Sequence, residues 1–208
     1  MAVDLSAQRR ELILASASAG RAAVLCGAGL DFRQRAADID ERALEDEAAT
    51  AGGGIDAGKL ALMLAAAKAR DVSAGKAGAL VIGADQVMEC EGVVYHKPAS
   101  AEAARRQLAQ LRGKTHSLNA GLCVAQDGAV LWQHLDRAHL TMRDVSDGFL
   151  DAYCRSEGEA LLRSVGSYRI EGRGIQLFSR IEGDYFTIIG LPLLPLLGYL
   201  REIDWLAA

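Results

Sequence analysis

The sequence lacks any pair of closely spaced cysteines. Its four cysteines, Cys26, Cys90, Cys123 and Cys154, lie far apart and form no CxxC motif. A structural zinc site needs clustered ligands, and no such cluster is visible. Spacing alone leaves disulfides open, but free thiols in a reducing compartment are the simpler interpretation.

A long apolar run is also missing. The most apolar late segment, 188–200, contains Pro192 and Pro195. It is shorter than the roughly 20 residues that a membrane-spanning helix needs. Residues 1–11 carry charges and no apolar core, which does not fit a signal peptide. We therefore expect a cytoplasmic protein that does not enter a membrane.

The chain has no excess of positive charge. Its formal net charge is -4 and its pI is about 5.6, whereas a duplex-binding domain usually has a basic face or a pI above roughly 9. Nucleic acid is therefore not an expected partner. Net charge does not exclude a local cationic pocket for a small anion.

Apolar residues, in contrast, are plentiful. They make up 50% of the 208 residues, and a chain of this length can bury a sizeable core. No repeat or linker divides the sequence. We expect one domain over 1–208, with 1–11 as a short N-terminal extension. The domain is expected either to be undivided or to have two lobes with a cleft.

Short apolar runs alternate with helix-forming segments, which is typical of an α/β or α+β fold. The expected strands cover 12–15, 32–36, 79–82, 93–95, 117–125, 130–141 and 175–181. The expected helices cover 21–28, 59–72, 100–111, 147–156 and 193–205. The glycine-rich segment 51–58 is expected to form a mobile loop.

The first candidate for chemistry is Leu14-Ala-Ser-Ala-Ser-Ala-Gly-Arg21, between a strand and a helix. Such a turn directs backbone N–H groups at an anion. Arginine adds a fork of donors suited to phosphate. The alternative is a helix cap followed by a surface arginine.

Two acidic segments come next. Asp38-Ile-Asp-Glu41 has three carboxylates in four residues, which suits a hard cation such as Mg²⁺ or, alternatively, a solvated acidic turn. Gly83-Ala-Asp85-Gln86 puts a carboxylate in a turn just past an apolar strand, where open α/β sheets bind ligands. Asp85 could bind a metal or activate water, or it could simply cap a turn.

Lysines supply further candidates. Lys97 lies in Tyr95-His-Lys-Pro98, between a strand and a proline, and Lys68 lies in the helix expected at 59–72. Either could bind phosphate, or either could be an ordinary exposed lysine. Segment 166–172, followed by 181–185 and 190–192, resembles a shaped loop over a cleft, or a set of turns between strands.

These segments together offer acids for a metal, cations for phosphates and donors on short turns. That set suits cleavage of a phosphoanhydride, in which catalysis is mostly positioning and charge neutralisation.

The same segments carry a resemblance to the Maf family of nucleoside triphosphate pyrophosphatases. The similarity runs from about Leu12 to Leu200. Its markers are L-I-L-A-S-A-S, D-I-D-E, L-A-A-A-K-A, V-I-G-A-D-Q-V, H-K-P, L-R-G-K-T-H and I-E-G-D-Y-F-T-I-I-G-L-P-L.

The resemblance implies an α/β fold like that of the inosine triphosphate pyrophosphatases, with a mixed sheet and two lobes around a nucleotide cleft. It implies hydrolysis of a nucleoside triphosphate to the monophosphate and pyrophosphate with Mg²⁺ or Mn²⁺. Asp85 would accept a proton and, with Glu41, hold the metal. The triphosphate would be bound by Ser16, Ser18, Arg21, Lys68 and Lys97.

Within the family, the chain is similar to the 7-methyl-GTP branch. Gln86 follows the catalytic Asp where the dTTP/UTP branch usually has Thr, and Glu171 stands where that branch has Gln. A carboxylate can accept hydrogen bonds from N1–H and N2–H of guanine, whereas an amide better suits the mixed edge of thymine or uracil. A dTTP/UTP pyrophosphatase is the alternative.

Three positions depart from the family pattern. Gly20 replaces a cation or an aromatic residue, His96 replaces a glycine, and Thr187 replaces an asparagine. The first of these, with the family's historical link to septum formation, keeps open a non-catalytic, nucleotide-binding regulator of cell division. The resemblance also makes a homodimer an expectation.

Overall fold

The computed structural model describes residues 10–50 and 56–207, and these form two compact units. Unit 1 contains the described residues up to Asp85, together with 120–136 and those from Tyr185 onward. Unit 2 contains 86–119 and 137–184. Each unit is described by itself below.

The strands form one mixed sheet in the order β2-β1-β3-β5-β6-β7, with β4 paired to β3. Their bounds are β1 (Leu12–Leu14), β2 (Arg33–Gln34), β3 (Leu80–Cys90), β4 (Val93–Tyr95), β5 (Thr115–Gln126), β6 (Ala129–Met142) and β7 (Phe178–Glu182). Strand β1 pairs in parallel with β2 and β3, whereas β4 and β7 run antiparallel to β3 and β6. The mixed sheet confirms the predicted α/β class.

The α-helices are α1 (Ala19–Gly27), α2 (Glu41–Thr50), α3 (Ala57–Ala74), α4 (Ala101–Leu111), α5 (Asp147–Glu157), α6 (Tyr185–Ile189) and α7 (Leu193–Glu202). Three short 3₁₀ helices, η1 (Gly158–Leu162), η2 (Val165–Ser167) and η3 (Arg173–Leu177), follow α5. No described helix is long and apolar enough to cross a membrane.

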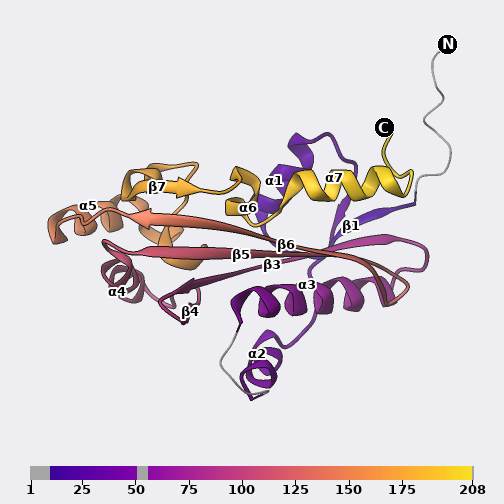
Figure 1. Ribbon diagram of the computed structural model, residues 1–208, viewed down its shortest axis with the longest axis horizontal. Helices are drawn as coiled ribbons and strands as arrows, with labels where there is room; N and C mark the ends of the chain where they lie inside the picture. The colour runs from indigo at the N-terminus through magenta and orange to yellow at the C-terminus, as the bar shows by residue number, and fades with distance from the viewer. Residues whose placement is uncertain (1–9, 51–55, 208) are drawn as a thin grey trace, which may run out of the picture. The chain divides into compact units, whose positions relative to one another are not determined.

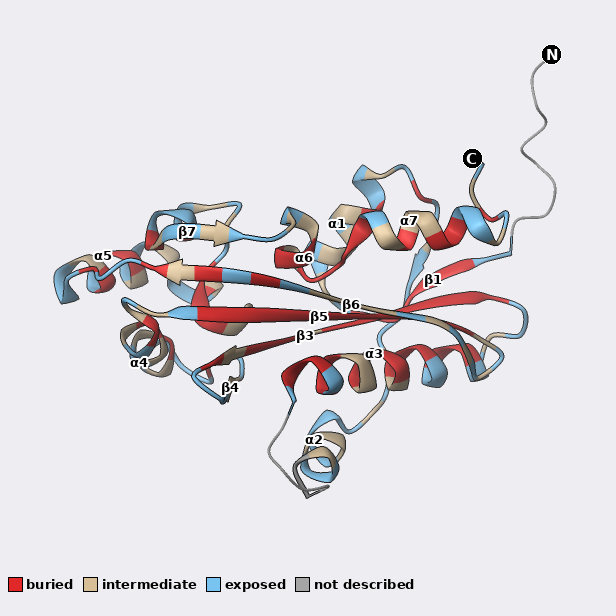
Figure 2. Ribbon diagram, in the orientation of Figure 1, coloured by how far each residue is buried: buried red, intermediate tan, exposed pale blue. Residues whose placement is uncertain are grey.

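Unit 1 is a three-layer structure, because alternate residues of its strands point to opposite faces. Helices α1 and α7 lie on one side of the strands and α3 lies on the other (Figure 1). The core on the α1 and α7 side includes Leu12, Leu14, Leu80, Ile82, Leu122, Val124, Leu196 and Leu200. The core on the α3 side includes Ile13, Ala15, Val81, Cys123, Ala125, Ala65, Ala69 and Val72. Strands β3 and β5 are largely buried, and so is much of α3 (Figure 2).

Glycine allows α3 to approach the sheet closely. A β-carbon at Gly83 would overlap the backbone oxygen of Ala65 and lie 2.8 Å from the backbone nitrogen of Ala69. A β-carbon at Gly121 would lie 2.5 Å from the backbone of Ala61. These two glycines therefore bring the α3 backbone against β3 and β5, which sets how far α3 side chains reach along the sheet.

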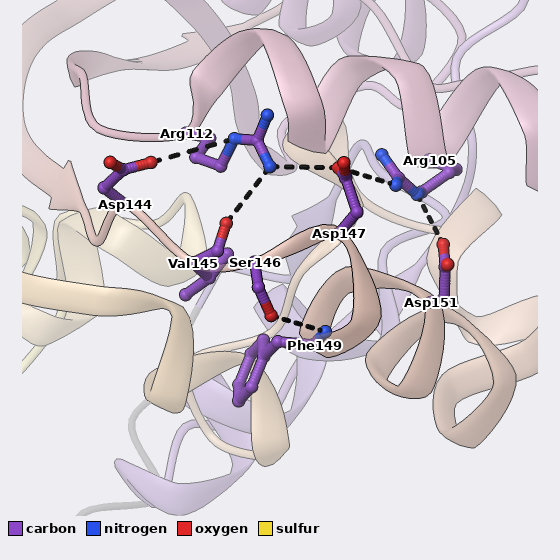
Figure 3. A network of polar contacts seen from close by, with 8 residues as sticks. All are labelled: Arg105, Arg112, Asp144, Val145, Ser146, Asp147, Phe149 and Asp151. Carbon is purple, nitrogen blue, oxygen red and sulfur yellow. Dashed lines mark hydrogen bonds and ion pairs between the residues drawn. The ribbon is translucent and has the colours of Figure 1, made fainter.

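Unit 2 is stabilised by a polar network between α4 and α5 (Figure 3). Arg105 donates to Asp147 and Asp151 at 3.0 and 2.8 Å. Arg112 donates to Asp147 at 3.0 Å and to the backbone oxygen of Val145 at 3.1 Å. Asp147 thus accepts from two guanidinium groups, and both cations keep its pKa below the ordinary value.

The structure corrects the prediction around Asp85. We expected the strand to end at Ile82 and Asp85 to lie beyond it in a turn, but β3 continues through Asp85 to Cys90. The glycine that we interpreted as a turn residue is instead where α3 packs. Asp85 lies two residues beyond Gly83, so its side chain is on the α3 face of the strand.

Several other predicted bounds differ from the structure. The strand expected at 175–181 begins only at Phe178, because 173–177 coil into η3. The coil is tight, since a β-carbon at Gly174 would lie 2.5 Å from the backbone oxygen of Arg169. Strand β2 is shorter than the predicted 32–36, and the short helix α6 was not predicted. Of the loop predicted at 51–58, residues 51–55 lie outside the described residues, while α3 begins at Ala57.

Candidate active site

A strand, a turn and a helix form the first part of the candidate site, as predicted. The turn at 16–18 follows β1, and Ser18 caps α1 by accepting from the backbone N–H of Arg21 at 3.3 Å. The backbone N–H of Ser18 donates to Ser16 Oγ at 3.2 Å. The turn and the first turn of α1 together present backbone donors at a helix N-terminus, where an anion is stabilised.

Gln34 of β2 holds this turn from the neighbouring strand. Its Nε2 donates to the backbone oxygen of Ser16 at 2.7 Å and to that of Ser18 at 3.4 Å. Binding both carbonyls from one side fixes the orientation of the peptide groups between them. We did not identify Gln34 from the sequence. Its place within the strand expected at 32–36 was the only available signal.

Arg21 is fixed by three acceptors. Its Nε donates to the backbone oxygen of Gly190 at 2.9 Å, and its Nη1 donates to the backbone oxygen of Ala84 at 2.8 Å and to Ser16 Oγ at 3.2 Å. The hydrogens on Nη2 have no acceptor among the residues that the structure describes. Arg21 is therefore a rigidly held cation with one edge left for an anion.

The charge of Arg21 is influenced by its surroundings. Burial lowers the pKa of its guanidinium from the ordinary value, while the negative charges of Asp85 and Glu41 act in the opposite direction. An arginine in proteins keeps its proton, so the group remains a cation close to two carboxylates.

Lys68 links these two carboxylates. Its Nζ lies 2.5 Å from Asp85 Oδ1 and 2.8 Å from Glu41 Oε1. The Lys68 and Asp85 side chains are each 11% exposed, whereas that of Glu41 is 50% exposed. Lys68 comes from α3, Asp85 from β3 and Glu41 from the first turn of α2, so three elements bring this cluster together.

The acidic segment 38–41 does not act as a single group. Asp40 accepts from the backbone N–H of Ala43 at 3.0 Å and so caps the start of α2. Asp38 is exposed, and its backbone N–H donates to Asp71 at 2.9 Å. Of the three acids, Glu41 contacts Lys68, and it belongs to a helix rather than to the turn that we predicted.

The structure thus brings together Ser16, Ser18, Arg21, Glu41, Lys68 and Asp85 in unit 1, linked through the backbone of Ala84. Gly20 lies exposed in the first turn of α1, where a β-carbon would lie 3.4 Å from Ile189 Cγ2, which is an ordinary contact. A β-carbon would thus fit at this position.

The remaining candidates belong to unit 2. Gln86 follows Asp85 in β3 and points to the opposite face of the strand. Lys97 is exposed after β4, and Glu171 is exposed in the turn at 170–172. That these three residues meet the unit 1 cluster stays a prediction.

The carboxylates of Asp85 and Glu41, which both contact Lys68, are ligands of the type that a divalent cation takes. The described residues contain no group of three or more His, Cys, Asp and Glu side chains that could hold a metal ion. Asp85 and Glu41 nevertheless place carboxylate oxygens within hydrogen-bonding distance of one cationic atom. Mg²⁺ commonly takes one or two protein carboxylates and completes its shell with waters and substrate phosphates. The residues therefore fit Mg²⁺ or Mn²⁺.

Comparison with known proteins shows which family the chain belongs to. The family model described as Maf-like protein matches residues 11–203. The 7-methyl-GTP pyrophosphatase of Brucella abortus biovar 1 is 51% identical over 192 residues, which cover 92% of this chain and 96% of that protein. The 7-methyl-GTP pyrophosphatase of Rhizobium meliloti is 52% identical with the same coverage. A nucleoside triphosphate pyrophosphatase of Nitrobacter winogradskyi is 48% identical and covers 94% of each chain.

A solved structure of a nucleoside-triphosphatase (dITP/XTP pyrophosphatase) from Mycobacterium abscessus covers 65% of this chain and 75% of its own at 13% identity, with a TM-score of 0.37. That score is too low to identify a common fold. The family assignment rests instead on the family model, which matches nearly the whole chain, and on relatives that are about half identical to it. This chain belongs to the family of Maf-like proteins.

Proposed function

We propose that this chain hydrolyses a nucleoside triphosphate to the monophosphate and pyrophosphate, and that 7-methyl-GTP is its substrate. The observation that carries the proposal is the Lys68–Asp85–Glu41 cluster, linked through Ala84 to Arg21 and the turn at 16–18. The names of the relatives from Brucella abortus and Rhizobium meliloti support the same activity.

The turn and Arg21 bind the triphosphate in this mechanism. Backbone N–H groups at the start of α1 face phosphate oxygens, and the Nη2 edge of Arg21 donates to the same group. The three hydrogen bonds that already hold Arg21 mean that little conformational entropy is lost on binding, which favours tight and oriented binding.

Asp85 is the proton acceptor. Lys68 binds its Oδ1, whereas Oδ2 has no hydrogen-bond partner among the described residues. A water oxygen forms a bond to the α-phosphorus as its proton passes to Asp85. The bond from the α-phosphorus to the bridging oxygen breaks, and pyrophosphate leaves with that electron pair. Lys68 compensates the negative charge that develops during the reaction.

Asp85 and Glu41 are the residues that would hold a divalent cation, Mg²⁺ or Mn²⁺. When bound, such an ion neutralises charge on the triphosphate. Lys97 adds a further cation for the phosphates. We also propose that the protein is cytoplasmic, as its sequence features indicate, and that it forms a homodimer, as the family resemblance implies.

Base selection is assigned to Glu171 and Gln86. The carboxylate of Glu171 accepts from the donor edge of guanine. It also compensates the positive charge that methylation at N7 places on the base. Thymine and uracil offer a single N3–H donor and carry no such positive charge, so the pair favours 7-methyl-GTP over dTTP and UTP.

A nucleotide panel tests the proposal. Pyrophosphate release with Mg²⁺ should be highest for 7-methyl-GTP and low for dTTP, UTP and GTP. Asp85→Asn should lower kcat by roughly 10²–10⁴-fold, the usual contribution of a general base. Higher activity on dTTP and UTP would overturn the substrate. Nucleotide binding without hydrolysis by the wild type would instead indicate a non-catalytic regulator.

A further inference from the structure

A partly buried hydrogen bond connects α6 to β6 on the side of unit 1 that contains Arg21. Thr187 Oγ1 donates to Asp136 Oδ2 at 2.7 Å, and Thr187 has 0% of its surface exposed. A hydroxyl–carboxylate bond of this length is charge-assisted and strong. It anchors a helix of five residues, which is too short to be stable by itself.

The end of α6 is continuous with the group that holds Arg21. The backbone N–H of Gly190 donates to the backbone oxygen of Thr187 at 3.0 Å. Gly190 has a φ of 93°, a left-handed value that favours glycine. This turn directs the Gly190 backbone oxygen at Arg21 Nε, 2.9 Å away.

A second contact ties α6 to the start of α1. A β-carbon at Gly20 would lie 3.4 Å from Ile189 Cγ2, so the last residue of α6 lies against the residue before Arg21. Figure 1 shows α6 beside α1. A displacement of α6 would therefore shift both the Gly190 carbonyl and the packing of the first turn of α1.

We infer that Thr187 and Asp136 are positioning residues for Arg21. By fixing α6, they hold the Gly190 carbonyl that orients the guanidinium, so that its Nη2 edge faces the phosphates. The inference rests on the proposed function, in which Arg21 binds the triphosphate. Neither residue has to touch the substrate, and the distinctive consequence is a loss of substrate binding rather than of the chemical step.

Thr187→Val tests this inference, because valine keeps the shape and removes the hydroxyl. We expect KM for 7-methyl-GTP to rise by roughly tenfold or more, since a lost or misdirected hydrogen bond to a charged group has effects of this size, with kcat within about twofold. Removal of uniform binding has this signature. A purely structural role would lower the folded fraction, and therefore the apparent kcat, and leave KM unchanged.

Two matched variants accompany it. Thr187→Ser retains the hydroxyl and should keep KM within about threefold of the wild type, because the donor to Asp136 survives. Ser73→Ala removes another hydroxyl of unit 1 with 0% exposure, which accepts from the backbone N–H of Gly128 at 3.0 Å. It should lower Tm without changing KM. An unchanged KM in Thr187→Val, or an equal rise in Ser73→Ala, would overturn the inference.

A second pair keeps the test decisive if Thr187→Val does not fold. Asp136→Asn keeps an oxygen acceptor of the same size and should raise KM less than Asp136→Ala does. The double variant Thr187→Val, Asp136→Ala should raise KM no more than the larger single effect, because both substitutions break the same hydrogen bond. Fully additive effects would show that the two residues act separately.

Binding of inorganic triphosphate, measured by calorimetry, separates this inference from the proposed function. Wild type that binds triphosphate but hydrolyses no nucleotide would refute the activity and leave the positioning role testable. In that case Thr187→Val should weaken triphosphate binding by the same factor of roughly ten. Equal binding by wild type and Thr187→Val would refute the positioning role alone.

Discussion

Lys68 Nζ lies 2.5 Å from Asp85 Oδ1, and only 11% of either side chain is exposed. The same nitrogen lies 2.8 Å from Glu41 Oε1. One ammonium thus compensates a largely buried carboxylate and a half-exposed one. Removing one member of such a cluster leaves charge uncompensated, which costs more than the pair contributes when intact. The cluster is therefore sensitive to substitution in both stability and activity.

Lys68→Met is expected to damage both properties. Methionine fills the same space but leaves Asp85 and Glu41 without their shared cation. We expect the free energy of unfolding to fall by about 3 kcal/mol and kcat/KM to fall by about 100-fold. Urea unfolding and steady-state kinetics measure the two effects. Lys59→Met, on an exposed part of α3, should change stability by no more than about 0.5 kcal/mol. Equal effects of the two variants would contradict the assigned role.

Metal dependence gives a second prediction. Chelation of divalent cations should stop hydrolysis. Glu41→Gln should raise the Mg²⁺ concentration needed for half-maximal activity by roughly tenfold or more, because it removes one of the two carboxylates proposed to bind Mg²⁺. Asp38→Asn alters an exposed acid of the same segment and should leave the Mg²⁺ requirement unchanged. If Glu41→Gln behaves like Asp38→Asn, Glu41 is not a metal ligand.

Local parts of the site could be predicted from the sequence, whereas contacts across the chain could not. The strand, turn and helix around Ser18 are a continuous segment, and the serine cap is visible in it. The Nε bond of Arg21, however, reaches Gly190, 169 positions away. Backbone acceptors have no residue type of their own, so no pattern indicates that this carbonyl holds the guanidinium.

The extent of β3 could not be predicted for a related reason. Gly83 breaks the apolar run 79–82, and glycine there is equally typical of a turn and of a close approach between backbones. Which of these applies depends on α3, whose packing is a tertiary property. The polar residues Asp85, Gln86 and Glu89 also interrupt the apolar pattern, so the sequence did not indicate that the strand continues.

Gly83→Ala tests the role of close packing. The added methyl group would overlap the Ala65 backbone oxygen, and backbone cannot move aside cheaply. We expect a loss of about 3 kcal/mol or more in the free energy of unfolding, the range of severe overpacking. Gly198→Ala in α7 is the control, since nothing lies within 4 Å of its β-carbon. That variant should gain about 0.5–1 kcal/mol from helix propensity. A neutral Gly83→Ala would show that α3 can shift.

Substrate choice is expected to depend on Glu171. Glu171→Gln replaces two acceptors by one acceptor and one donor, so it should reduce the ratio of kcat/KM for 7-methyl-GTP to that for UTP by about tenfold or more. Glu159→Gln, at an exposed position of the same unit, should leave the ratio unchanged. An unchanged ratio in Glu171→Gln would move base selection to other residues.

His116 makes the stability of unit 2 depend on pH. It is 1% exposed, its Nε2 lies 2.7 Å from the Tyr168 hydroxyl, and its Nδ1 has no partner among the described residues. Burial lowers its pKa from 6.5 to about 4. Below pH 6.5 the unfolded chain binds a proton that the folded chain does not bind until about pH 4. Stability due to neutral His116 is therefore complete above pH 6.5 and is lost as pH falls to about 4.

The size of this loss follows from the interval. At about 1.4 kcal/mol for each pH unit, the interval from 6.5 to about 4 corresponds to about 3 kcal/mol. Carboxylates also titrate in this range, so the measurement is a difference between proteins. Urea unfolding at pH 7, 6, 5 and 4 should show a shallower decline for His116→Gln than for the wild type. His139→Gln, at an exposed position of β6, should follow the wild-type curve. Parallel curves for wild type and His116→Gln would mean that protonation of the buried ring costs little free energy. The lowered pKa of His116 would then be wrong.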